Sequence, residues 1–221
     1  MVDYASEEEQ VEALKRWWRE NGTSIIAGAA IGILALVGWR GWTWHQETQA
    51  LVASGLYEQV SAQLQGGDRE ALVSVAEQLR EDYASTAYAP LAALAAARAA
   101  VDAGEHDAAA EWLRWAMENA GDTKTGYLAR GRLARVEAAN GEIDAGLALL
   151  DVDAPSAWAG LYGEIRGDLL TEQGDREAAA EAYRVALDAE VPPPDTGAVQ
   201  RKLNEVQGAA ADRGGDGEEA S

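Results

Sequence analysis

The sequence has no cysteine, no phenylalanine, five prolines and only two histidines among its 221 residues. Without cysteine the chain can form neither a disulfide nor a thiolate zinc site, and it has no cysteine nucleophile. The two histidines, His45 and His106, leave too few groups for an imidazole metal site or a catalytic triad. The sequence also contains no phosphate-binding loop and no nucleophile motif. We therefore expect no metal, no cofactor and no enzymatic activity.

Positive charge is scarce as well. The chain has 18 lysines and arginines against 38 aspartates and glutamates, which gives a formal net charge of −20. Proteins that bind nucleic acids need a face rich in basic side chains to replace the counterions of the phosphates. Anionic lipid headgroups would repel such an acidic body in the same way. The balance of charge excludes a nucleic-acid partner.

One long apolar run stands near the N-terminus. The 19 residues from Asn21 to Trp39 carry no charge, and as a helix they would be about 28 Å long, close to the thickness of the hydrocarbon core of a bilayer. A buried core helix is the alternative, but core helices of this length seldom lack every charge. Five of the eight tryptophans also flank the run, as an aromatic belt at a membrane interface would: Trp17, Trp18, Trp39, Trp42 and Trp44. We expect a transmembrane helix over residues 22–41.

The residues before the run indicate an anchor that is not cleaved. A signal peptide would begin with a basic segment and end at small residues, whereas residues 1–21 contain six acids. Lysine and arginine are more numerous on the N-terminal flank, with Lys15, Arg16 and Arg19, than on the other flank, with Arg40. The rule that positive flanks stay inside predicts a cytoplasmic segment 1–21 and an exported remainder, which in a Gram-negative cell lies in the periplasm.

Small residues recur along one side of the predicted span. Ser24, Gly28 and Gly32 are four residues apart, and such spacing lets two transmembrane helices approach closely. This face is a candidate docking site for another membrane helix. The alternative is that glycine is simply frequent in membrane helices.

The remainder of the chain contains an internal repeat. Glycines at 67, 104, 141 and 174 are each followed by an acidic segment and then alanine, at separations of 37, 37 and 33 residues. Glycine favours the end of a helix and acids favour the start of the next one. A spacing near 34 residues is typical of repeats made of two helices, and 47 alanines favour close helix packing.

These patterns place the elements of an exported domain over residues 42–207. We expect helices at Trp42–Gln65, Arg69–Tyr83, Thr86–Ala103, Asp107–Asn119, Thr123–Asn140, Ile143–Leu150, Ser156–Gln173 and Arg176–Ala189. The helix of the membrane span is expected to continue without a break into the first of these. A short capping helix, Thr196–Val206, follows three prolines. Residues 208–221 are acidic and have little to bury, so we expect a disordered tail.

The last repeat resembles a tetratricopeptide repeat in more than its length. It has glycine, alanine and tyrosine at the separations of that pattern, at Gly167, Gly174, Ala179, Tyr183 and Ala186. Small residues at these positions let two helices cross closely, and the tyrosine fills the space between helix pairs. The predicted fold is therefore all-α: a single N-terminal transmembrane helix followed by a tetratricopeptide-like α-solenoid.

In repeats of this kind the first helix of each pair lines the concave face. Alignment on the turn glycines places there Leu91, Leu94, Arg98 and Val101 from one unit, Leu128 and Arg135 from the next, and Leu161, Glu164 and Asp168 from the last. A groove rich in leucine could hold an extended segment or a helix of a partner. The alternative is that several of these leucines belong to the core between repeats.

Several segments resemble the YfgM family of ancillary subunits of the bacterial SecYEG translocon. The likeness lies in QVEALKRWW (10–18), ENG (20–22), GWR (38–40), WHQ (44–46), LARGRLARV (128–136) and WAGLYGEIRGD (158–168). The resemblance implies a single-pass protein of the bacterial inner membrane that associates with the SecYEG translocon and with the periplasmic chaperone PpiD. It also implies that the protein assists newly exported client proteins.

Two other functions fit the same residues. The repeats could form a scaffold for a different complex of the cell envelope, such as one of cell-wall assembly. The chain could also regulate a partner through its cytoplasmic segment Met1–Asn21, where Val11, Leu14 and Trp18 fall on one helical face beside Lys15. The identity of the partners separates these functions.

Overall fold

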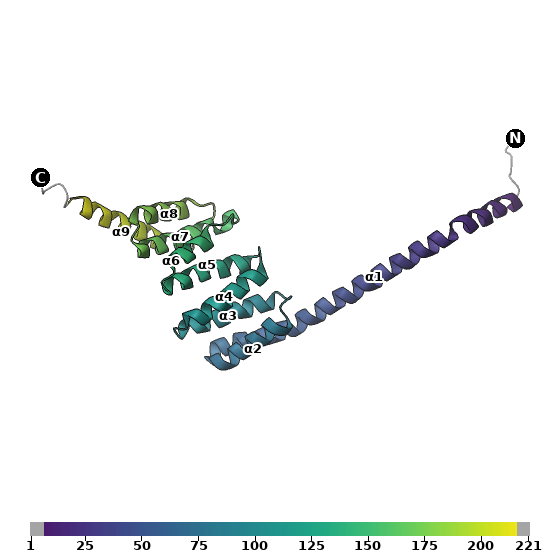
Figure 1. The fold of residues 1–221 in the computed structure, drawn as a ribbon, viewed down its shortest axis with the longest axis horizontal. Coiled ribbons are helices and arrows are strands. Elements are labelled where there is room, and N and C mark those ends of the chain that lie inside the picture. Colours follow the sequence, from purple (N-terminus) through teal and green to yellow (C-terminus); the bar gives the residue numbers. More distant parts are fainter. Residues whose placement is uncertain (1–6, 216–221) are drawn as a thin grey trace, which may run out of the picture. The chain divides into compact units, whose positions relative to one another are not determined.

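The computed structural model describes residues 7–215, with the side chains of residues 9–208. All regular secondary structure in that part of the chain is α-helical (Figure 1). In chain order the helices are α1 (Glu7–Gly66), α2 (Arg69–Asp82), α3 (Tyr88–Asp102), α4 (His106–Ala120), α5 (Lys124–Ala139), α6 (Ile143–Leu150), α7 (Ser156–Gln173), α8 (Arg176–Asp188) and α9 (Thr196–Gly215). The expected all-α fold is confirmed.

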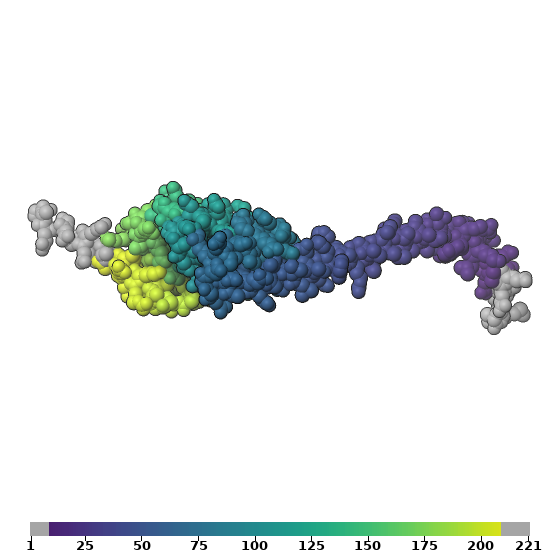
Figure 2. All heavy atoms as spheres, turned by 90° about the horizontal axis from the view of Figure 1, so that it is seen from below, coloured from purple at the N-terminus to yellow at the C-terminus, as the bar shows by residue number. Residues whose placement is uncertain are grey.

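The chain divides into two compact units between Gln49 and Ala50. The first unit consists of the greater part of α1, which runs unbroken through the predicted span 22–41 and into the first repeat helix. Large apolar side chains of the span are exposed, for example Ile31 at 68% and Leu34 at 71%, and Figure 2 shows the atoms of this helix at the purple to blue end of the colour scale. The helix is therefore long and apolar enough to cross a membrane, and it is not a core helix of the described chain.

The helices of the second unit lie where the sequence places them. The bounds of α6 and α7 are those predicted, and those of α2, α3, α4, α5 and α8 differ by no more than two residues at either end. The largest of these shifts is at the start of α3, which begins at Tyr88 instead of Thr86. Thr86 is buried and its hydroxyl donates a hydrogen bond to the carbonyl of Tyr83 at 2.8 Å, so it belongs to the turn.

A glycine with left-handed backbone angles joins the two helices of each pair. The φ angles are 75° at Gly67, 76° at Gly104, 87° at Gly141 and 89° at Gly174. Side chains disfavour this conformation because of their Cβ atom, which is why glycine stands there. At the first and last turns an aspartate then caps the next helix: Asp68 accepts from the N–H of Ala71 at 3.1 Å, and Asp175 from that of Ala178 at 3.0 Å.

From α2 to α9 each helix packs on the next in chain order, as in a solenoid (Figure 1). The largest core cluster lies among the end of α1 and helices α2 to α5, and twelve of its twenty buried residues are alanines. A second cluster joins α5, α6 and α7, and a third joins α8 and α9. Because alanine adds only a methyl group, the helix axes can approach closely and still exclude water.

The closest approach in the last pair involves Gly167 and Tyr183. The Tyr183 ring is buried and lies against the bare Cα of Gly167, where a Cβ atom would collide with it. Its neighbour Gly163 faces Ala186, whose Cα would lie 3.0 Å from an added Cβ. These contacts explain the residues that carry the tetratricopeptide pattern in this unit.

The C-terminal helix is longer than expected. We predicted that it would end at Val206 and that a disordered tail would follow, but α9 continues to Gly215. Three consecutive alanines, from Ala209 to Ala211, have high helix propensity and carry the helix past the capping segment. Residues 216–221 of the predicted tail lie outside the described residues.

The Gly167 contact predicts a large stability effect from one methyl group. We expect Gly167→Ala to lower the free energy of unfolding by about 1 to 3 kcal/mol, because the added Cβ overlaps the Tyr183 ring. The control is Gly55→Ala, at an exposed position of α1 with open space around it, which should be neutral or stabilising by up to about 1 kcal/mol. Urea unfolding of the full chain, followed by circular dichroism, measures both. An equal loss in the two variants would contradict the packing argument.

Two buried tyrosines predict a loss of stability in alkali. Burial raises the pKa of Tyr162 to about 12, and burial, reinforced by Asp168, raises that of Tyr183 further. Unfolding returns both groups to a pKa near 10, so their stabilising effect is complete below pH 10 and is lost as the pH rises toward 12. We expect a decrease of about 1 to 2 kcal/mol per group between pH 9 and 11.5. Urea titrations across this range should show a shallower decrease for Tyr162→Phe; an unchanged slope would exclude a contribution from Tyr162.

Candidate partner-binding groove

Four of the nine predicted groove residues line one cleft. Helices α3 and α5, the first helices of successive pairs, lie side by side. Leu94, Arg98 and Val101 of α3 face Arg135 of α5 across a cleft of about 220 Å³. The geometry thus brings together an apolar surface and two arginines from neighbouring repeats, as the alignment on the turn glycines expected.

The other three leucines lie outside this cleft. Leu91 and Leu128 are half-buried and pack against the largest core cluster. Leu161 is half-buried as well and packs against the cluster that joins α5, α6 and α7. Their contacts are those of inter-repeat core, which is the alternative that the sequence left open.

The cleft also contains residues that the sequence analysis missed. Arg132 lies one helical turn before Arg135 on the same side of α5, and Leu113 comes from α4. Arg132 and Arg135 are three residues apart, and this spacing indicates from the sequence alone that both lie on the same side of a helix. Leu113 could not be found in this way, because the alignment assigned the concave face to the first helices alone.

The arginines give the cleft a positive charge in a chain of net charge −20. Burial lowers the pKa of Arg132, and the neighbouring charges of Arg98 and Arg135 lower it further. Arg98 has a carboxylate oxygen of Asp102 3.7 Å away, and Arg135 has one of Asp168 at the same distance. Both distances are too long for a hydrogen bond, so these are weak ion pairs.

Helix α9 is bound to α7 through one lysine. Lys202 of α9 donates to Asp168 at 2.7 Å and to Glu164 at 2.9 Å, both on α7. Burial lowers the pKa of Lys202, but these two hydrogen bonds outweigh it and the pKa is raised overall. Asp168 also accepts from the Tyr183 hydroxyl at 2.9 Å. Glu164 and Asp168, which the alignment placed in the groove, therefore hold α9 on the last repeat.

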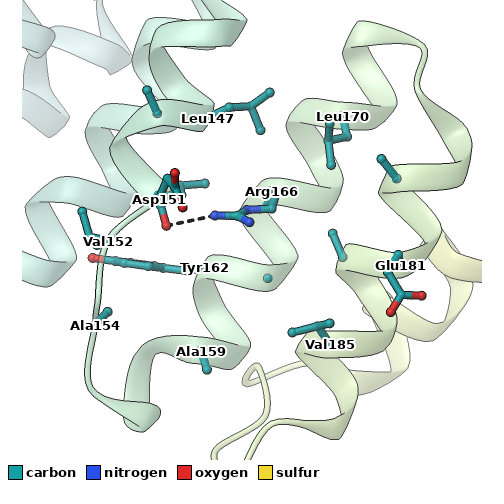
Figure 3. Close-up of a pocket in the computed structure, with 15 residues that line it drawn as sticks. Leu147, Asp151, Val152, Ala154, Ala159, Tyr162, Arg166, Leu170, Glu181 and Val185 are labelled. Atoms are coloured by element: carbon teal, nitrogen blue, oxygen red, sulfur yellow. Dashed lines mark hydrogen bonds between the residues drawn. The ribbon is translucent and has the colours of Figure 1, made fainter.

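A larger concavity of about 740 Å³ lies between α6, α7 and α8 (Figure 3). It exists because α6 has only 8 residues, whereas the second helices α2, α4 and α8 have 14, 15 and 13. Its wall is mainly apolar and includes Leu147, Tyr162, Leu170 and the exposed Val185. The short helix thus leaves a gap in the layer of second helices.

Two arginines bind the carbonyl groups at the end of this short helix. Arg166 of α7 crosses the concavity and donates to the Leu150 carbonyl at 3.1 Å (Figure 3). Arg130 of α5 donates to the Leu149 carbonyl at 3.4 Å. The last carbonyls of a helix have no partner within it, and a cation there also interacts favourably with the helix dipole. Both arginines therefore have a structural role.

The small residues of the predicted span form one side of α1. Ser24, Gly28 and Gly32 are exposed. A Cβ atom added at either glycine would meet no atom of the described chain within 4 Å beyond its own helix. The face has the open, shallow surface that close helix docking requires.

Comparison with known proteins gives the same architecture. The family model for a tetratricopeptide repeat-like domain matches residues 15–208. Tetratricopeptide-like repeats of a putative kinesin light chain from Podosopora anserina superpose with a TM-score of 0.56. They cover 75% of this chain and 90% of the solved chain at 17% identity, which supports the fold alone.

Two relatives are similar over almost their whole length. The ancillary SecYEG translocon subunit of Escherichia coli (strain K12) is 32% identical over 206 residues, which cover 93% of this chain and 99% of that protein. The protein of the same name from Haemophilus influenzae is 31% identical over 184 residues, covering 83% and 90%. The first match leaves out so little of this chain that it includes both the apolar helix and the repeats.

Buried and exposed residues of the cleft should respond differently to truncation. Leu94 is only 6% exposed and belongs to the core, so Leu94→Ala should lower the free energy of unfolding by about 2 to 4 kcal/mol. Val101 is 39% exposed, and Val101→Ala should change it by less than about 1 kcal/mol. Urea unfolding of both variants tests this; equal losses would mean that Val101 is not at an open surface. Val101 is therefore the better position at which to probe binding.

Proposed function

The chain belongs to the family of ancillary SecYEG translocon subunits with a tetratricopeptide repeat-like domain, and we propose that it serves the SecYEG translocon as a non-enzymatic accessory. The observation that carries this proposal is the 32% identity over 99% of the Escherichia coli protein of that name. The match includes both the anchor and the repeats, so it is not explained by a repeat domain shared among unrelated proteins.

In this proposal α1 crosses the inner membrane once, with its N-terminus in the cytoplasm. Lys15, Arg16 and Arg19 precede the apolar stretch, against Arg40 after it, and such an excess of positive charge stays on the cytoplasmic side. The repeats then lie in the periplasm. The face of Ser24, Gly28 and Gly32 is open, and it docks against a transmembrane helix of the channel.

The repeats act as a scaffold at the exit of the channel. Their exposed concave cleft combines apolar and cationic groups, which suits the binding of protein segments. Following the family resemblance, the proposed partners are the chaperone PpiD and newly exported client proteins. The scaffold would hold the chaperone close to emerging chains and so raise its local concentration there.

The proposal predicts which proteins are isolated with this one. We expect a pull-down of the tagged chain from its native membrane, in a mild detergent, to recover SecY, SecE, SecG and PpiD, identified by mass spectrometry. Gly28→Ile with Gly32→Ile should lower SecY recovery severalfold, because the added side chains prevent close helix approach. Ala30→Ile is the matched control, since Ala30 lies on the opposite side of the helix.

Two outcomes would contradict this prediction. Recovery of another envelope complex without SecY, SecE and SecG would overturn the translocon function while leaving the fold unchanged. Equal loss of SecY in the Ala30→Ile control would exclude a docking role for the glycine face.

A further inference from the structure

The guanidinium groups of Arg98, Arg132 and Arg135 have unused hydrogen-bonding capacity. Within residues 9–208 none of the three is within hydrogen-bond distance of a carboxylate, and no acid lies within 4 Å of the Arg132 guanidinium. The nearest acid to Arg135, Asp168, is already bound by Lys202 and Tyr183. Each guanidinium has five N–H donors, and most of these donors have no partner among the described residues.

Several other arginines of the same domain are bound directly to acids. Arg69 makes a bidentate ion pair with Glu105. Arg114 binds Glu137 at 2.7 Å, and Arg184 binds Glu181 at 2.9 Å. An acidic protein has an excess of carboxylates with which to pair its arginines. Arg132 has no acid within 4 Å among the described residues, and the acids nearest to Arg98 and Arg135 lie beyond hydrogen-bond distance. This group of three is therefore more weakly paired than those arginines, and mutual repulsion adds to its cost.

The repeat register produces this group. Arg98 and Arg135 each stand six residues before the turn glycine of their pair, Gly104 and Gly141. Equivalent positions on neighbouring first helices face the same side of a solenoid, so the two arginines flank one cleft. Arg132, one turn earlier on α5, completes a cationic rim on that cleft.

Between the arginines the wall is apolar. Leu94, Ala97, Val101, Leu113 and Val136 line it, and the volume of about 220 Å³ suits one or two aliphatic side chains. A free inorganic anion would use the arginines and leave this surface in water. An apolar helix would cover the surface and desolvate the arginines without pairing them, which is costly. The occupant must therefore offer both an apolar side chain for the wall and anionic groups for the arginines.

We propose that this cleft binds an acidic segment of a partner protein, in which a leucine or similar residue enters the cleft and flanking carboxylates pair with the three arginines. Planar guanidinium groups bind carboxylates through two parallel hydrogen bonds, which gives direction as well as attraction. The inference deepens the proposed scaffold function and rests on it, because it names the chemistry of the segment that the repeats hold.

The test uses a fluorescein-labelled peptide, GEDLDEG, and the full chain in detergent micelles. Fluorescence anisotropy is measured at about 0.15 M salt, where the remaining acids of the protein are screened beyond about 8 Å. We expect saturable binding that is at least tenfold tighter than that of the neutral peptide GQNLNQG. Arg132→Gln should weaken binding by about tenfold. Arg184→Gln, which removes the same charge from α8, is the matched control and should change the affinity by less than twofold.

Charge reversal keeps the test independent of folding defects. Arg132→Glu, with an unchanged circular dichroism spectrum, should lose GEDLDEG and gain affinity for the basic peptide GKRLRKG. Equal binding of the acidic and neutral peptides would overturn the proposal, and so would an Arg132→Gln variant with unchanged affinity. A chain that ends at Gly208 and binds GEDLDEG tenfold more tightly would also overturn it, because the acidic C-terminal tail would then be the occupant.

The proposed function and this inference can fail separately. If the peptide does not bind but SecY is still recovered from membranes, the cleft proposal fails and the translocon function stands. If the peptide binds in an arginine-dependent way but another envelope complex is recovered, the cleft proposal stands and the translocon function fails.

Discussion

The fold of the exported domain depends on how closely its helices can approach. Alanine or glycine stands at the crossing points: twelve alanines in the largest core cluster, Gly163 and Gly167 in the last pair. Such short side chains leave little for each contact to bury, so stability comes from many small contacts repeated in chain order. The close approach of the helices also explains why the large ring of Tyr183 lies opposite Gly167, where no Cβ atom obstructs it.

Much of this architecture could be read from the sequence because its signals are local. A turn glycine needs a positive φ, and an aspartate that follows it caps the next helix, so Gly174 and Asp175 determine a helix boundary by themselves. Helix α3 begins later than predicted because Thr86 bonds back to the turn. Helix α9 extends beyond its predicted end because the helix propensity of its alanines outweighs the acidic composition of the segment.

The cleft was predictable only in part, for a different reason. Repeat register gave the residues on the concave side of α3 and α5, and so it found Arg98, Val101 and Arg135. Register alone does not say how deeply a side chain is buried, so it leaves open whether Leu94, Leu91 and Leu128 line the groove or belong to the core. The structure places them in or against the core. Glu164 and Asp168 were assigned to an open face because the sequence gives no sign that Lys202 reaches them from α9.

The short α6 has a consequence for how the domain opens. In a solenoid the cooperativity of unfolding passes only between neighbouring helices, and α6 is the point at which the layer of second helices is thinnest. Helices α7 to α9 are joined to one another by the Tyr183 and Lys202 contacts. We expect them to open as a unit apart from α2 to α5, because the layer of second helices connects the two sides only through α6. Amide hydrogens on the two sides of α6 would then exchange with solvent at two distinct rates, and the boundary between those rates would lie at the shortest helix within residues 7–215.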